Sequence, residues 1–111
     1  KANLGHALET AVLLELDRRG AEVGYVRTAQ GFEVDFHARH VDGREELIQV
    51  CASVEHQDVL AREVRALQDA VTDHPRAAQI FIALDKPALL KASTGVTIVA
   101  ARDWLLRDKA A

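Results

Sequence analysis

Apolar and polar residues alternate with a period of two along two neighbouring segments, residues 32–40 and residues 46–53. Such alternation is typical of strands that bury one face. In the first segment one side carries Phe32, Val34, Phe36 and Ala38, and the other carries Glu33, Asp35, His37 and Arg39. In the second segment Ile48, Val50 and Ala52 oppose Leu47, Gln49, Cys51 and Ser53. The intervening Asp42-Gly43 favours a tight turn, so we expect an antiparallel hairpin.

The register of this hairpin follows from the same pattern. Residues that pair directly across two strands share a face, so the two apolar sides must match. That match places Asp35 opposite Gln49 or Cys51 and never opposite Val50. We therefore expect Asp35, Gln49 and Cys51 to lie together on one face of the hairpin.

Helical and strand patterns account for most of the remaining chain. Residues 4–19 carry an apolar stripe and are followed by Gly20, which favours a helix that ends there. The stripe consists of Leu4, Leu8, Ala11 and Val12, widened by Leu13 and Leu16. Similar patterns predict strands at 22–27, 78–84 and 96–100 and helices at 57–73 and 102–109. The resulting order, αβββαββα, predicts an α/β fold with a mixed central sheet flanked by helices.

Size and charge narrow the function classes. The chain has 111 residues, 49% hydrophobic and 28% charged, which suits one domain with one core. Its formal net charge of -3 argues against a domain that binds nucleic acid by itself, because phosphate binding normally needs a basic surplus. No apolar run reaches the roughly 18 residues of a membrane helix. Cys51 is the single cysteine, which fits a cytoplasmic protein, and the absence of methionine suggests a domain taken from a longer protein.

Four polar residues on three predicted elements are candidates for a site. Glu9 lies on the first helix, Asp35 on the second strand, and Gln49 and Cys51 on the third strand. An acid on the first helix, an acid on the second strand and an acid-x-lysine pair on the third resemble the core of PD-(D/E)XK nucleases. In those enzymes the acids hold a divalent metal and the lysine activates the attacking water.

The wording of the motifs resembles one family more closely, a domain of unknown function found at the C-terminal end of prokaryotic AAA-type P-loop ATPases. The motifs that carry this resemblance are Leu8-Glu9-Thr10, Arg18-Arg19-Gly20, Tyr25-x-Arg27-Thr28, Glu33-Val34-Asp35-Phe36, Leu47-Ile48-Gln49-Val50-Cys51, Arg62-Glu63-x-x-Ala66-Leu67 and Trp104-Leu105-Leu106. They span nearly the whole chain. The resemblance implies a single nuclease-like domain, residues 1–111, attached in the full-length protein to an ATPase.

The chain departs from the nuclease pattern at the positions that would carry out catalysis. Gln49-Val50-Cys51 stands where an active enzyme would carry Glu-x-Lys. Mg²⁺ prefers charged oxygen ligands, and Gln49 offers only a neutral amide oxygen beside Asp35. Cys51 provides no cation to stabilise the transition state. We therefore expect a non-catalytic accessory domain that serves partner binding or assembly. The alternative is a metal-dependent nuclease with an atypical D…QxC motif that uses Mg²⁺.

Other interpretations of the same residues stay open at this stage. Asp35, His37 and Cys51 could form a softer transition-metal site, since imidazole and thiolate suit zinc. Asp35 and Glu9 could be ordinary polar residues, and Cys51 a small buried hydrophobe. A plain homo-oligomerisation module is a third function class. We expect His56 and His74 to lack a partner at ligand spacing, and Arg18-Arg19 to be a solvated helix end.

Overall fold

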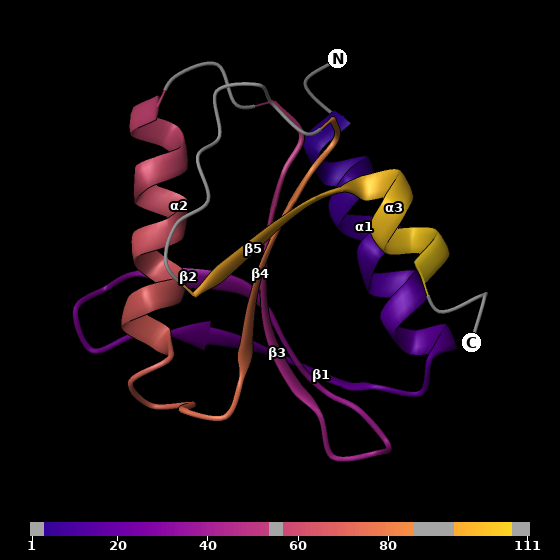
Figure 1. Ribbon diagram of the computed structural model, residues 1–111, viewed down its shortest axis with the longest axis horizontal. Coiled ribbons are helices and arrows are strands. Elements are labelled where there is room, and N and C mark those ends of the chain that lie inside the picture. The colour runs from indigo at the N-terminus through magenta and orange to yellow at the C-terminus, as the bar shows by residue number, and fades with distance from the viewer. Residues whose placement is uncertain (1–3, 54–56, 86–94, 108–111) are drawn as a thin grey trace.

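The computed structural model describes residues 4–53, 57–85 and 95–107, which form a mixed five-stranded sheet with helices on both faces (Figure 1). In chain order the elements are α1 (Leu4–Arg18), β1 (Glu22–Arg27), β2 (Glu33–Arg39), β3 (Glu45–Cys51), α2 (Gln57–Ala70), β4 (Ala78–Ala83), β5 (Val96–Ala100) and α3 (Ala101–Leu106). The predicted order of elements and the α/β fold with a mixed sheet flanked by helices are confirmed. None of the helices in these ranges is both long enough and apolar enough to cross a bilayer.

The strands lie side by side in their chain order, β1-β2-β3-β4-β5. The first three are antiparallel, whereas β4 and β5 run parallel to β3. A parallel neighbour requires a crossover connection, and α2 supplies it between β3 and β4. As predicted, β4 is an interior strand, and its last four residues are buried because helices cover both faces of the sheet.

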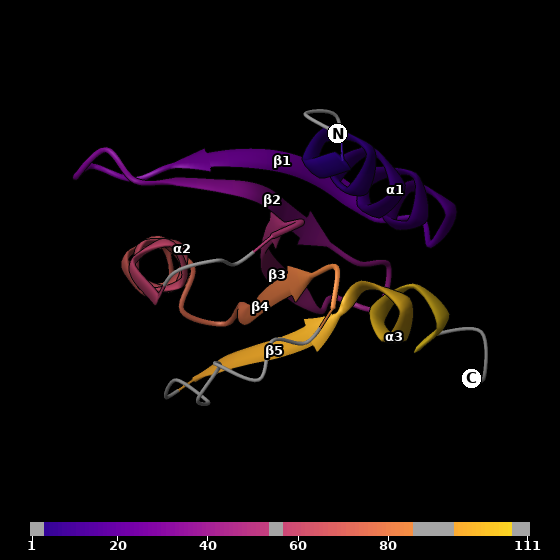
Figure 2. The same cartoon turned by 90° about the horizontal axis from the view of Figure 1, so that it is seen from above.

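One core lies between the sheet and the helices α1 and α3, which Figure 2 shows together on one face. Helix α1 contributes Leu8, Val12 and Leu16 to this core. The predicted stripe is wrong for Leu4 and Leu13, which are 48% and 41% exposed, and the predicted burial of Leu16 is confirmed. The contact face of α1 is a single narrow line.

Polar side chains at the C-terminal end of α1 connect this helix to α3. Arg19 donates hydrogen bonds to the Glu15 carboxylate and to the Trp104 carbonyl, each at 2.8 Å, and its guanidinium lies 4.3 Å from the centroid of the Trp104 ring. Its side chain is only 8% exposed, against 54% for Arg18. The expectation of a solvated Arg18-Arg19 pair is therefore wrong for Arg19, which joins α1 to α3.

The second core lies between the sheet and α2. Leu60, Val64 and Leu67 of α2 pack with Leu47 and Phe81 of the sheet. The β1–β2 hairpin extends beyond the rest of the sheet toward α2, as Figure 2 shows. Its residues Val26, Phe32 and Val34 belong to or pack against this second core.

The pairing of β1 with β2 contains one irregularity. Gly24 pairs with His37 and Val26 with Val34, so Tyr25 alone lies opposite both Asp35 and Phe36. An extra residue of this kind is a β-bulge, which disrupts the regular alternation of side chains. As a result Val34 belongs to the core on the α2 side and Ala38 to the core on the α1 side. The prediction that both share one face is wrong, and the bulge lies at Asp35.

Candidate functional site

The strands β2 and β3 separate at Asp35. Their regular pairing runs from Arg39 opposite Glu45 to Phe36 opposite Ile48, and beyond that point side chains replace the backbone ladder. The register brings Asp35 beside Gln49, in agreement with the sequence prediction. We call this region, formed by Glu33, Asp35, Gln49 and Val50, the fork.

Gln49 bridges the fork with both ends of its amide. Its Oε1 accepts a hydrogen bond from the Asp35 backbone N–H at 2.8 Å, and its Nε2 donates to the Glu33 carbonyl at 3.0 Å. The side chain is 2% exposed. Buried backbone groups need partners, and here the Gln49 amide satisfies two groups of β2. A glutamate at this position could not donate to the Glu33 carbonyl unless it were protonated.

Asp35 completes the bridge in the opposite direction. Its Oδ2 accepts a hydrogen bond from the Val50 backbone N–H at 2.8 Å. Burial raises the pKa of the Asp35 carboxyl to about 6; the Val50 hydrogen bond opposes this, and the negative charges of Glu9 and Glu33 add to it. Desolvation disfavours a charged carboxylate, so a carboxyl here holds its proton to an unusually high pH.

Two further carboxylates surround Asp35 from the two helices. Glu9, on α1, was predicted from the sequence, and it lies close enough for its charge to raise the pKa of Asp35. Glu63, on α2, was not predicted. Burial raises the pKa of Glu63, and the charges of Asp35 and Glu9 raise it further. The sequence signals for Glu63 were its place beside the apolar stripe of α2 and its place in the motif Arg62-Glu63-x-x-Ala66-Leu67.

Cys51 is the last residue of β3, two residues after Gln49. The thiol is half-buried, and its Sγ donates a hydrogen bond to the Ser53 carbonyl at 3.1 Å. Burial raises the pKa of this thiol, and the charges of Glu63 and Asp35 add to the effect. A raised pKa disfavours the reactive thiolate, so Cys51 is neither a good nucleophile nor a cation. The nearby positive charge belongs to Arg62, which opposes the rise in the pKa of both Cys51 and Glu63.

The alternative prediction of a zinc site formed by Asp35, His37 and Cys51 is wrong. Within the described ranges the ligand atoms of Asp35, His37 and Cys51 do not converge; His37 meets Glu45 and His74 instead. The expectation that His74 lacks a partner is therefore also wrong, because its Nδ1 lies 3.5 Å from Glu45 Oε2. The prediction for His56 falls outside the described residues.

Comparison with known proteins adds no family assignment. No family model matches the chain, and searches of curated proteins and of solved structures give no significant match.

Proposed function

We propose that this chain is a nuclease-like scaffold without catalytic activity, which serves as an accessory domain of an AAA-type ATPase. One observation carries the proposal. Gln49 stands where the second metal-binding acid of a nuclease would be, and both ends of its amide are hydrogen-bonded to the backbone of β2. At 2% exposure this amide stabilises the sheet and is not directed toward a metal or a substrate.

The topology supports the nuclease-like part of the proposal. A helix, three antiparallel strands, a crossover helix and a parallel strand follow each other in the order that the PD-(D/E)XK resemblance implies. Asp35 and Gln49 also lie where β2 and β3 separate, and the charge of Glu9 on α1 acts on Asp35. The proximity of Asp35 and Gln49 supports the proposal that these residues stand at the positions of the motif.

The residue at the lysine position supports the absence of catalysis. Phosphodiester cleavage builds negative charge that an enzyme must stabilise, and the loss of one preorganised donor costs roughly 10²–10³ in rate. Cys51 cannot supply that charge, since its thiol is half-buried, donates to a carbonyl and has a raised pKa.

The accessory role rests on the resemblance together with the surface of α1. Leu13 is 41% and Leu14 is 64% exposed on this helix, away from the buried line of Leu8, Val12 and Leu16. Exposed leucines on a helix that already buries another face offer apolar area to a partner domain. The partner of the proposal is the attached ATPase.

A second candidate function is a metal-dependent nuclease with the D…QxC motif. It is favoured by the three carboxylates Glu9, Asp35 and Glu63, which influence each other's charge at the fork. Arg62, on α2, adds a positive charge on the same side as Glu63 and Cys51. In this reading Glu63 replaces the missing acid, Arg62 replaces the missing lysine, and Mg²⁺ is the cofactor.

A cleavage assay separates the two candidates. The purified chain is incubated with supercoiled plasmid, linear duplex DNA, single-stranded DNA and RNA in Mg²⁺ or Mn²⁺, beside Asp35→Asn and Glu63→Gln variants. We expect no cleavage above the level of the Asp35→Asn protein. Metal-dependent cleavage that is lost in Asp35→Asn and Glu63→Gln, but kept in the exposed control Glu22→Gln, would overturn the proposal in favour of the nuclease.

A further inference from the structure

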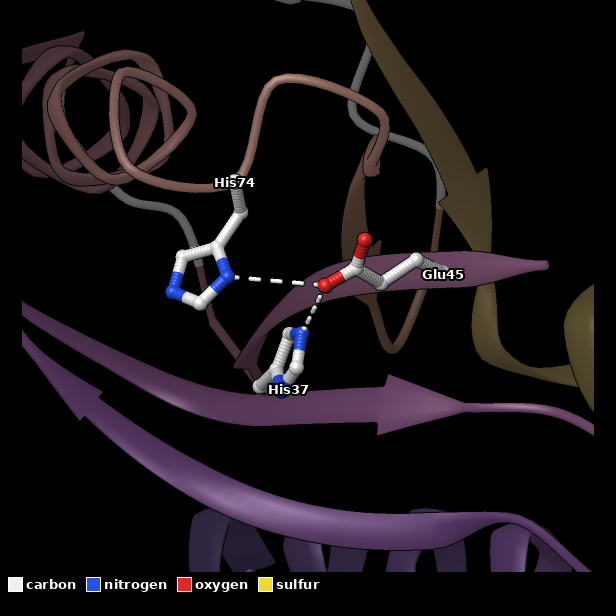
Figure 3. Close-up of side chains that lie close together, drawn as sticks. All are labelled: His37, Glu45 and His74. Carbon is white, nitrogen blue, oxygen red and sulfur yellow. Dashed lines mark hydrogen bonds and ion pairs between the residues drawn. The ribbon is translucent and has the colours of Figure 1, made fainter. Parts of the chain in front are cut away.

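Three ligand-type side chains converge at the opposite end of β3 from the fork. His37 comes from β2, Glu45 from the start of β3, and His74 from the segment that follows α2 (Figure 3). Glu45 lies four residues before Gln49, roughly 13 Å along the strand. This cluster is therefore separate from the fork and goes beyond the proposed function.

Both imidazoles approach the same carboxylate oxygen. Glu45 Oε2 lies 2.5 Å from His37 Nε2 and 3.5 Å from His74 Nδ1, as the dashed lines in Figure 3 mark. The two rings are 4.5 Å apart between centroids. All three ligand atoms lie within 4.8 Å of one another, although they come from three separate segments of the chain.

The surroundings of the cluster suit a bound ion. The side chains of His37, Glu45 and His74 are 14%, 18% and 27% exposed, so they are held by the fold while His74 keeps a route to solvent. The hydrogen bond from His37 lowers the pKa of the Glu45 carboxyl, and His74 acts in the same direction.

We propose that His37, Glu45 and His74 form a binding site for a divalent transition metal of the Zn²⁺ class. Two imidazoles and one carboxylate suit Zn²⁺ and disfavour Mg²⁺ or Ca²⁺, which prefer all-oxygen shells. Bonds of about 2.0–2.2 Å at tetrahedral angles separate ligand atoms by roughly 3.3 Å. The 3.5 Å between His74 Nδ1 and Glu45 Oε2 already fits this spacing.

The contact between His37 and Glu45 changes when the metal binds. The hydrogen bond between the two atoms must break, and its proton must leave to solvent, before both atoms coordinate the ion. The atoms then move apart by less than about 1 Å, which side-chain rotation can supply. Water takes the fourth position, as in other sites with three protein ligands. The ion joins the β2–β3 hairpin to the segment after α2.

The same hairpin contains an internal comparison. His40 Nε2 and Glu46 Oε1 lie 2.7 Å apart in a second, more deeply buried histidine–glutamate pair. Among the described residues only the group around Glu45 brings three such ligands together. The His40–Glu46 pair is therefore interpreted as a structural contact. The proposed metal site differs from it by the second imidazole, that of His74.

The test uses chain freed of any histidine tag and of metal by EDTA dialysis. Calorimetry with Zn²⁺, and the visible absorption of Co²⁺ as a substitute, are measured for the unmodified chain and for His74→Ala and Glu45→Gln. The exposed helix variant His6→Ala is the control. Circular dichroism checks that each variant is folded, and His74→Ala, at a partly exposed position, decides the result if Glu45→Gln does not fold.

We expect one Zn²⁺ per chain and a Co²⁺ spectrum with the strong bands of a four- or five-coordinate site. His74→Ala should weaken Zn²⁺ binding by about 100-fold or more, since even indirect supports of metal ligands account for 10–100-fold. His6→Ala should bind as the unmodified chain does, and Mg²⁺ should not compete. Absence of Zn²⁺ binding to the unmodified chain, or equal binding by His74→Ala, would overturn the proposal.

Discussion

Gln49 Oε1 accepts a hydrogen bond from the Asp35 backbone N–H at 2.8 Å, across the point where β2 and β3 stop pairing. These two residues are thereby joined to each other and to the sheet. The Asp35 carboxylate returns the contact through the Val50 N–H, again at 2.8 Å. The fork is thus a structural joint in which two side chains take the place of the backbone pairing between β2 and β3.

Removal of the Gln49 amide should weaken this joint. Gln49→Leu leaves the Asp35 N–H and the Glu33 carbonyl without their partner in a buried place. Each unsatisfied backbone group costs about 1–3 kcal/mol, so we expect the free energy of unfolding to fall by about 2–4 kcal/mol. Urea unfolding measures the loss. The control Gln68→Leu, at an exposed position of α2, should change stability by less than about 0.5 kcal/mol.

Asp35 should make stability depend on pH with a defined sign. Its folded pKa of about 6 lies above the usual 3.8, so the folded state favours the protonated form. The stabilising contribution of the protonated Asp35 carboxyl to the free energy of unfolding is fully present below about pH 4. It is lost as the pH rises through about 6. Asp35→Asn keeps an oxygen for the Val50 N–H and removes the titration.

We therefore expect Asp35→Asn to be more stable than the unmodified chain by about 1–2 kcal/mol near pH 7.5. This range is reduced from the roughly 3 kcal/mol of a two-unit shift, because the carboxyl is only partly buried. The gain should disappear near pH 4. Denaturant unfolding at several pH values measures it, and a gain that is the same at every pH would contradict the assignment.

The two arginines at the end of α1 should differ in their effect. Arg19→Met removes hydrogen bonds to Glu15 and to the Trp104 carbonyl and the contact with the Trp104 ring. We expect a loss of about 2–3 kcal/mol, because a buried acid loses one of its charged partners. Arg18→Met is the matched control, since its exposed guanidinium binds the same Glu15 and should cost less than about 1 kcal/mol. Equal losses in thermal unfolding would contradict the buried role of Arg19.

The sequence predicted β3 better than β2 for a physical reason. Along β3 the alternation holds, and Ile48 and Val50 face α1 while Leu47 faces α2. Along β2 the apolar residues Val34 and Ala38 are two steps of alternation apart yet lie in different cores. A pattern of apolar and polar residues cannot reveal the extra residue of a bulge when both faces of the strand are covered.

The sequence predicted the contacts of the candidate site that lie between the neighbouring strands β2 and β3. It did not predict the contacts that depend on how α2 packs on the sheet. The proximity of Asp35 and Gln49 follows from alternation and a tight turn, and it is observed. Glu63 and His74 belong to the region around α2, whose position over the sheet is set by tertiary packing. No local pattern specifies that Glu63 lies beside Asp35 or that His74 lies beside Glu45.

A Mg²⁺ titration followed by ¹H–¹⁵N NMR tests the central claim most directly, because the amides of Asp35 and Val50 report on the two hydrogen bonds of the fork. The acceptors of these hydrogen bonds, Gln49 Oε1 and Asp35 Oδ2, are the oxygen atoms that a metal at the fork would have to bind. We predict that neither amide resonance shows a saturable shift as Mg²⁺ is added, and that Asp35→Asn responds in the same way. Saturable shifts at both amides that vanish in Asp35→Asn would show a metal site at the fork and contradict the account.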